Sequence, residues 1–318
     1  MVKNAIVVLL TVIAAVSIGL IFIFYSFFSA PQIRAEAEWF VVPQKTERDE
    51  TIAKLYGEGF IKSRTAMNAV LYLNGVGDEV RPGGYSVSKS MNVFKIAAAL
   101  NQAPDQKWVV LWEGMRKEEM AELLAKSFKW DEKNLNDFIN AYDEGVYFPD
   151  TYLVPKNESG KEMARRMFNR FNEKITSYTA ELTEQNIRLD TTIKIASLIQ
   201  REASGKEDAR LISGIIWNRL LVGMKLDIDA TIQYALGNAE NGWWPTVRSE
   251  DRRAESPYNT YLNAGLPPAP IANPGINSIE AVLFPEKTDC LFYIHANRQT
   301  YCSATYDGHL DNIKRYLR

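Results

Sequence analysis

The chain has 318 residues and a formal net charge of −2, with 37 basic and 39 acidic side chains, so its charge does not favour nucleic-acid binding. Two cysteines and two histidines are too few soft ligands for a structural zinc site. The sequence has no glycine-rich phosphate loop and no G-x-S-x-G nucleophile elbow, which argues against a metal, a nucleotide cofactor and Ser-His-Asp catalysis.

The first predicted element is an uncharged apolar run over residues 5–28. A run of about two dozen apolar residues is long enough to cross a bilayer as a helix. The alternative is a cleaved signal peptide, but its apolar region is shorter, and Ser29-Ala30-Pro31 is a poor cleavage site. We therefore predict a retained anchor, with residues 1–4 as a short cytoplasmic tail and the rest of the chain outside the cytoplasm.

Residues 35–104 are predicted to form a small module of strands and helices. Strands are expected at 39–42 and 85–87, a helix with Thr46 as its N-cap, a second helix over 63–73, and a turn over 82–84. This order resembles the βααβ carbohydrate-binding module called LysM. A short Ile-Ala-rich pattern recurs at 51–55, 95–100 and 119–123, although such a pattern is also a common core face of helices.

Residues 105–160 are predicted to form a second small α/β module and a linker. Its elements are a strand over 108–112, a helix over 129–142, a turn-rich aromatic stretch over 144–152 and a polar loop over 155–160. The domain boundary is expected within 144–160, and residues 161–318 form the last domain. The predicted fold class is α+β, with a transmembrane helix, a LysM-like module and a mixed helical and β domain.

The most informative side chain of the last domain lies in residues 191–205. In a helix, Glu202 shares one face with Ile195, Leu198 and Ile199, so a carboxylate takes a place where an apolar residue is expected. Burial disfavours the charged form and raises the pKa, as a general acid working near neutral pH requires. The alternative is a glutamate near a helix end that reaches solvent or pairs with an arginine.

Two irregular stretches are predicted among the next helices. A helix covers 208–222, Asp229 is the expected N-cap of a helix over 230–236, and residues 237–253 form a mobile flap. In this flap Trp243 and Trp244 either stack on sugar rings or pack in the core. Residues 256–275 contain five prolines and two glycines, which excludes regular structure and is typical of a functional loop.

The C-terminal part is predicted to form a short helix over 279–283, a β-hairpin and a final helix over 309–317. The hairpin pairs 291–295 with 301–305 about Asn297-Arg298. Cys290 and Cys302 then lie almost opposite each other. They can form a disulfide in an oxidising compartment, and two buried free thiols are the alternative.

Six separated blocks resemble the MltG (YceG-like) family of endolytic murein transglycosylases and occur in the order of that family. They are residues 195–202 (IASLIQRE), 217–220 with 223–226 (WNRL and GMKL), Asp229 with Tyr234, 256–261 (SPYNTY), 265–268 (GLPP) and 271–275 (IANPG). In the N-terminal half, residues 144–152 also resemble the family. The likeness extends from the anchor to the C-terminus.

The resemblance implies a bacterial inner-membrane lyase with an extracytoplasmic catalytic domain. The implied reaction cleaves MurNAc-β-1,4-GlcNAc bonds in nascent peptidoglycan, forms 1,6-anhydroMurNAc ends and terminates strand elongation. Glu202 matches the essential acid of the family, while Gln200 replaces a second acid of the same block. One carboxylate suffices for this chemistry, because the C6 hydroxyl of the sugar is the nucleophile, whereas a hydrolase needs two carboxylates. The implied partners are glycan strands, the membrane and a peptidoglycan synthase, and no cofactor or nucleic acid is expected.

Polar and aromatic residues near these blocks are the candidates for the sugar-binding shell, and structural support of the proline-rich loop is their alternative role. They are Asn218, Tyr234, Tyr258, Asn259, Thr260 and Tyr261. Thr300 stands where the family often has a histidine, so no role is carried over there. Two other functions stay open: a non-catalytic LysM-type peptidoglycan-binding scaffold, and a conventional muramidase with Asp227 or Asp229 as its second carboxylate.

Overall fold

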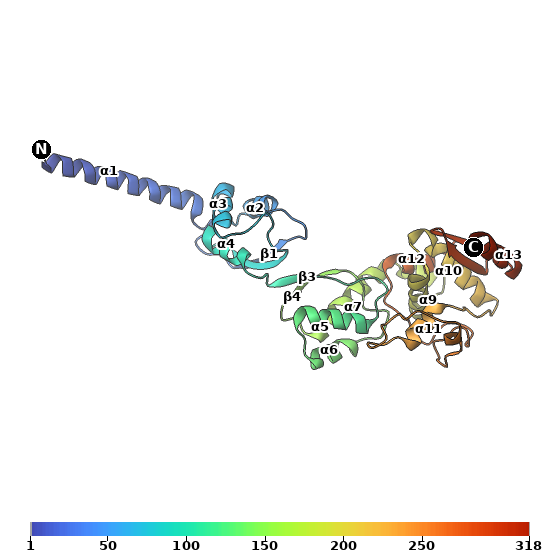
Figure 1. The fold of residues 1–318 in the computed structure, drawn as a ribbon. Helices are drawn as coiled ribbons and strands as arrows, with labels where there is room; N and C mark the ends of the chain where they lie inside the picture. The colour runs from blue at the N-terminus through green and yellow to red at the C-terminus, as the bar shows by residue number, and fades with distance from the viewer. Residues whose placement is uncertain (1, 318) are drawn as a thin grey trace. The chain divides into compact units, whose positions relative to one another are not determined.

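The computed structural model describes residues 2–317, which fold into two compact units (Figure 1). Unit 1 contains the chain up to Val109 and the segment Tyr152–Lys156, and unit 2 contains Val110–Thr151 and the chain from Asn157 onward. Met1 of the predicted tail and Arg318 of the predicted last domain lie outside the described residues. The predicted domain limits at 104/105 and 160/161 stay predictions.

Unit 1 begins with the helix α1 (Val2–Ile23), which continues into the π-helical turn η1 (Phe24–Phe28). Within the described part of the chain, Ala5–Phe28 is the single stretch that is long and apolar enough to cross a membrane. At 1.5 Å per residue this stretch spans about 36 Å, slightly more than the hydrocarbon core of a bilayer. Most of its side chains are exposed, and the ring of Phe28 stacks on Phe94 at 5.6 Å where the apolar stretch ends.

The rest of unit 1 is a four-stranded sheet with helices between its strands, in the order β1-β2-β3-β4. Its elements are β1 (Ala37–Val42), α2 (Arg48–Gly57), α3 (Arg64–Leu73), β2 (Gly83–Ser88), α4 (Val93–Asn101), β3 (Gln106–Val110) and β4 (Thr151–Pro155). β1 pairs antiparallel with β2, with Phe40 opposite Tyr85, and both rings are buried in the core with Leu55 and Ile96. The predicted βααβ order is confirmed, whereas its likeness to LysM stays a prediction.

Four local predictions for this part of the chain are wrong. Thr46 does not cap α2, because Glu47 occupies the N-cap position and makes no side-chain cap bond. Gly83 and Gly84 belong to β2 and not to a turn; a Cβ at Gly83 would collide with the backbone of Gln106 on the neighbouring strand, and one at Gly84 would meet the flexible side chain of Gln106. β3 ends at Val110, before the predicted limit, and the strand β4 was missed because Pro155 ends it.

Unit 2 is mainly helical and has a small hairpin before its last helix. Its elements are α5 (Lys117–Phe128), α6 (Glu132–Ile139), α7 (Gly160–Thr176), α8 (Thr179–Glu184), α9 (Leu189–Glu202), α10 (Lys206–Leu221), α11 (Asp229–Leu236), η2 (Glu250–Arg253), α12 (Ile276–Leu283), β5 (Phe292–Ala296), β6 (Gln299–Ser303) and α13 (Tyr306–Tyr316). α9 contacts α10, α11 and α12. The predicted apolar stripe is confirmed, since Ile195, Leu198 and Ile199 are fully buried in this core.

The proline-rich loop covers α9 without regular structure. Residues 256–275, all of which the structure describes, form no helix or strand, as predicted. The hydroxyl of Ser197 on α9 accepts a hydrogen bond from the backbone N–H of Ile271 at 3.1 Å. The loop is therefore fixed to the buried face of the helix that ends at Glu202.

The predicted hairpin is confirmed. β5 pairs antiparallel with β6, and Asn297 and Arg298 both have positive φ angles, of 53° and 61°, as a two-residue type I′ turn requires. Cys290 and Cys302 form a disulfide with their Cα atoms 5.8 Å apart. Of the two alternatives left open by the sequence, the structure therefore has the bridge.

Candidate active site

Glu202 is the last residue of α9, and its carboxylate is held by hydrogen bonds from two other elements. The hydroxyl of Tyr293 on β5 donates to Oε2 at 2.6 Å, and the backbone N–H of Ala230 near the start of α11 also donates to the carboxylate. Burial raises the pKa of Glu202, and these two hydrogen bonds oppose the rise. The structure therefore fits the predicted carboxyl group that holds a proton at unusually high pH.

Asp229 lies at the start of α11, close to Glu202. It is the first residue of the helix and not its N-cap, so that prediction is wrong; the N-cap position belongs to Ile228. Its carboxylate instead accepts a 2.7 Å hydrogen bond from the hydroxyl of Tyr261 and lies 3.6 Å from the guanidinium of Arg252. The negative charge of Asp229 adds to the effect of burial on the pKa of Glu202.

The six predicted shell residues separate into three groups. Tyr261 reaches the Glu202 region through Asp229. Tyr234 and Tyr258 face each other farther along α11, with ring centroids 4.7 Å apart. The third group is Asn218, Asn259 and Thr260, whose side chains form hydrogen bonds with backbone groups of neighbouring segments.

The asparagines and the threonine of this set hold neighbouring segments in place. Asn218 donates to the carbonyls of Thr288 and Cys290, just before β5. Asn259 is fully buried and donates to the carbonyl of Ala254, and Thr260 accepts from the N–H of Ile228. These contacts fit the alternative of structural support, and contact with sugar stays a prediction for all three.

The neighbours of Glu202 on α9 point to other partners, as the helical face predicts. The Oε1 atom of Gln200 accepts hydrogen bonds from Gly275 and Ser278, both at 2.9 Å. The guanidinium of Arg201 lies 3.7 Å from the ring centre of Trp244, whose indole N–H donates to Glu119 at 2.9 Å. Trp244 is therefore held on both sides by protein groups.

His295 and Tyr293 were missed among the candidates, although both lie in the predicted strand over 291–295. Their rings are 5.5 Å apart. The Nδ1 atom of His295 lies 2.9 Å from the hydroxyl of Thr300 and 3.6 Å from the carboxylate of Asp208. The usable signal was the alternation of the strand, which places residues 293 and 295 on one face.

A fully buried carboxyl group in unit 2 belongs to Glu144. Its carboxylate accepts hydrogen bonds from the backbone N–H of Lys117, at 3.1 Å, and from the side-chain amide of Asn273. The carbonyl of the same amide accepts from the N–H groups of Gly145 and Tyr147. Because every contact joins one chain segment to another, Glu144 is a structural tether between the start of α5 and the proline-rich loop.

We expect Glu144 to make the stability of the chain depend on pH. Burial raises the pKa of Glu144 to about 8, from an ordinary value of 4.5. Between these pH values the unfolded state binds fewer protons than the folded state, so the free energy of unfolding falls as the pH rises, by up to about 1.4 kcal/mol per pH unit. In thermal melts from pH 5 to 8, Glu144→Gln should flatten this fall.

The matched control for this measurement is Glu132→Gln, at an exposed position in the first turn of α6. It should keep the slope of the wild-type chain. Equal slopes for Glu144→Gln and wild type would show that the Glu144 carboxyl does not carry the pH dependence.

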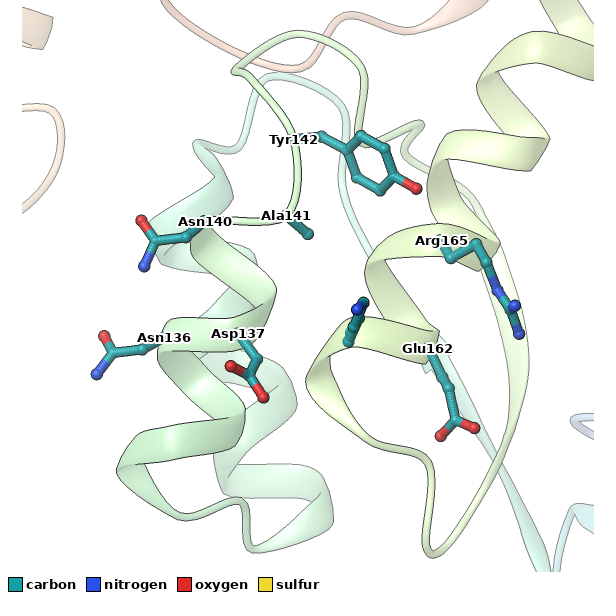
Figure 2. Close-up of a pocket in the computed structure, with 8 residues that line it drawn as sticks. Asn136, Asp137, Asn140, Ala141, Tyr142, Glu162 and Arg165 are labelled. Carbon is teal, nitrogen blue, oxygen red and sulfur yellow. The ribbon is translucent and has the colours of Figure 1, made fainter.

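A hollow of about 570 Å³ in unit 2 lies between α6 and α7 and contains none of the predicted site residues (Figure 2). Asn136, Asp137 and Asn140 approach it from α6, and Glu162 and Arg165 from α7 (Figure 2). Asp137 pairs with Lys133 at 2.5 Å, and Glu162 caps the N-terminus of α7 through Ser159. Its carboxylates are therefore engaged at the surface and lack the desolvation that distinguishes Glu202.

Comparison with known proteins gives a family match over most of the chain. The model of the YceG-like family matches residues 40–315. A crystal structure of a yceG-like protein, lmo1499 from Listeria monocytogenes, is similar with a TM-score of 0.59 and 26% identity, over 87% of this chain and 98% of that chain.

Two curated relatives are similar over a shorter region. The endolytic murein transglycosylase of Bacillus subtilis (strain 168) is 35% identical over 178 residues, which cover 55% of this chain and 48% of that protein. The protein of the same name from Streptococcus pneumoniae serotype 2 (strain D39 / NCTC 7466) is 28% identical over 177 residues, or 55% of this chain and 32% of that protein. The matched region thus spans about half of the first relative and about a third of the second.

Proposed function

The chain belongs to the YceG-like family, and from this premise we propose that it is an endolytic murein transglycosylase with Glu202 as its catalytic acid. The observation that carries the proposal is the desolvated carboxyl group of Glu202, held between Tyr293 and the start of α11. The names of the two curated relatives support the same reaction class. The substrate we propose is the MurNAc-β-1,4-GlcNAc bond within a glycan strand.

In this reaction Glu202 acts first as an acid and then as a base. The protonated carboxyl gives its proton to the glycosidic oxygen while the bond from that oxygen to the anomeric carbon breaks. The C6 hydroxyl of the same MurNAc then attacks the anomeric carbon, and the carboxylate takes the hydroxyl proton as the 1,6-anhydro ring closes. The proton returns to Glu202, so the cycle needs neither water nor a second carboxylate.

Tyr293 and Ala230 orient the acid during this cycle. Their hydrogen bonds stabilise the carboxylate that forms after the first proton transfer, and burial favours the protonated group before it. The charge of Asp229 lies close enough to act on Glu202 and can oppose the positive charge that develops on the sugar ring. Tyr261 holds Asp229 in place.

We propose further that Ala5–Phe28 anchors the chain in the bacterial inner membrane, with the residues after it outside the cytoplasm. The Cys290–Cys302 disulfide supports this compartment, because disulfides persist in oxidising surroundings. The βααβ part of unit 1 is proposed as a LysM-like glycan-binding module, and a peptidoglycan synthase as a partner. The proposed role is to end the elongation of new strands.

The deciding experiment is digestion of purified murein by the full chain in detergent micelles, with mass analysis of the new ends. Release of 1,6-anhydroMurNAc ends supports the proposal. Reducing MurNAc ends would instead indicate a muramidase in which Asp229 acts as the second carboxylate. Binding of murein without cleavage would identify a scaffold.

Tyr293→Phe is expected to shift the pH profile of cleavage. Cleavage by the wild-type chain should fall as the pH rises through the pKa of Glu202, because the acid loses its proton. The Tyr293 hydroxyl stabilises the carboxylate, so its loss raises the pKa of Glu202 further and moves this alkaline limb upward by about one pH unit, with kcat reduced about tenfold.

Tyr301→Phe is the matched control, because this tyrosine lies on β6 of the same hairpin and its hydroxyl bonds Gln299. The alkaline limb of its pH profile should coincide with that of the wild-type chain. An unmoved limb in Tyr293→Phe would contradict the role given to this hydrogen bond.

A further inference from the structure

A cavity of about 520 Å³ in unit 2 has no role in the proposed proton transfers. It lies beside the first residues of α9, near the end of α11 and under Pro268–Pro270 of the proline-rich loop. Its lining includes Ile193 of α9 and Tyr234 of α11, but not Glu202 or Tyr293. The cavity is thus separate from the carboxyl group of Glu202. The same two helices, α9 and α11, contribute residues to both places.

The chemistry of the lining suits an uncharged ligand with both apolar and polar groups. Phe171, Ile193 and Pro270 supply apolar walls, and the rings of Tyr234 and Tyr258 meet there at a 49° angle. Glu144 also lines the cavity, and its raised pKa of about 8 keeps it mainly protonated at neutral pH. A pyranose ring has apolar C–H faces and polar edges, and its N-acetyl methyl group needs an apolar wall.

Two charged side chains that line the cavity are engaged by the protein, and a third, Asp143, is exposed to solvent. The amine of Lys117 donates to the carbonyl of Tyr142 at 3.3 Å, and the carboxylate of Asp190 pairs with Lys194 at 2.9 Å. These contacts reduce the attraction that the cavity offers to an ionic ligand. A neutral sugar fits this lining better than an anion or a cation does.

The cavity is connected to the catalytic end by α11 and the loop beside it. Ala230, which bonds Glu202, and Tyr234, which lines the cavity, are four residues apart on α11, or about 6 Å along the helix axis. The loop follows the same course, since Tyr261 bonds Asp229 and Tyr258 contacts Tyr234. A strand lying along α11 can therefore reach both places.

We infer that this cavity is a subsite for an N-acetylated sugar of the glycan strand, a short distance along the strand from the bond that Glu202 breaks. The inference rests on the proposed function for the identity of the strand. Sugar bound in the cavity holds the strand in register, so the subsite contributes to substrate affinity and not to the chemical step. It selects strands long enough to extend from Glu202 to Tyr258.

The test is hydrogen–deuterium exchange of the full chain in detergent micelles, with and without a β-1,4-linked N-acetylglucosamine hexamer. The hexamer should protect peptides covering 143–146 and 256–270. Ala269→Trp fills the cavity from its rim and should remove this protection, whereas Ala264→Trp, at an exposed position of the same loop, should keep it. In murein digestion Ala269→Trp should raise KM about tenfold with kcat within about twofold of wild type.

The wild-type exchange pattern decides the inference even if a variant fails to fold. Protection confined to other peptides, such as those of unit 1, or equal protection in Ala269→Trp, would overturn it. A chain that protects the cavity peptides but releases no anhydro ends would refute the proposed reaction and leave the sugar site standing. A chain that cleaves murein without protecting these peptides would refute the sugar site and leave the proposed reaction standing.

Discussion

Replacing Glu202 by glutamine is expected to lower the rate of murein cleavage by about a thousandfold or more. The amide keeps the size of the side chain and can still accept the hydrogen bond from Tyr293, but it has no proton to give to the glycosidic oxygen. General acid–base catalysis by a positioned side chain contributes about a hundredfold to ten-thousandfold, and in the proposed reaction one group carries both proton transfers. The measurement is single-turnover release of anhydro ends by the full chain in detergent.

Glu207→Gln provides the matched control, because Glu207 is an exposed glutamate in the first turn of α10, five residues after Glu202. It should cleave at the wild-type rate. The Glu202→Gln chain should also melt at or above the wild-type temperature, since removing a desolvated carboxyl relieves a burial cost. Cleavage by Glu202→Gln within tenfold of wild type would exclude Glu202 as the acid and direct attention to Asp229.

Local sequence patterns predicted the elements whose causes are themselves local. The period of Ile195, Leu198 and Ile199 placed Glu202 on the buried face of α9, and burial of the three apolar side chains confirms that face. Proline density excluded regular structure over 256–275, and Asn297-Arg298 marked the turn of the hairpin. In each case residues close in sequence determine the conformation.

The partners of the site residues depend instead on contacts between distant segments. Tyr293 bonds Glu202 across 91 positions, and Asn273 bonds Glu144 across 129. No periodicity within α9 indicates which strand will face its last turn. The same limit explains Asp229, which reads locally as a helix cap but bonds Tyr261 because the loop passes beside α11.

Glycine and tryptophan show a second limit, since one residue type serves several structural purposes. Gly83 and Gly84 suggested a turn, but they belong to a strand, and at Gly83 the backbone of β3 lies too close for a side chain. The stacking surface suggested by Trp243 and Trp244 is partly taken by arginine, because the guanidinium of Arg116 lies over both rings and that of Arg201 lies over Trp244. The residue types indicated that these positions have a particular structural role, but they did not indicate which contact requires that residue.

Asn273→Ala is expected to destabilise unit 2 by several kcal/mol, on the order of 3 or more. The fully buried amide accepts from the N–H groups of Gly145 and Tyr147 and donates to Met115 and Glu144. Alanine leaves the buried N–H groups of Gly145 and Tyr147 without this partner and removes one donor each from Met115 and Glu144, and each unpartnered buried group costs about 1–3 kcal/mol. A total loss of about 3 kcal/mol corresponds to a fall in melting temperature of about 6–12 °C.

The measurement is a thermal melt of the full chain in detergent, followed by circular dichroism, with Asn241→Ala as the control. Asn241 is an exposed asparagine, so its variant should melt within about 2 °C of wild type. Asn273→Asp distinguishes the contribution of the amide oxygen from that of the amide nitrogen. The variant keeps both acceptor contacts and loses both donor contacts. At pH 6 the raised pKa keeps Glu144 protonated, so its O–H can donate to the new carboxylate. The melting temperature of Asn273→Asp should then lie between those of Asn273→Ala and wild type. At pH 9 Glu144 has lost this proton, and the melting temperature should approach that of Asn273→Ala. A melting temperature of Asn273→Ala equal to that of Asn241→Ala would show that the Asn273 amide does not contribute to holding the loop in place.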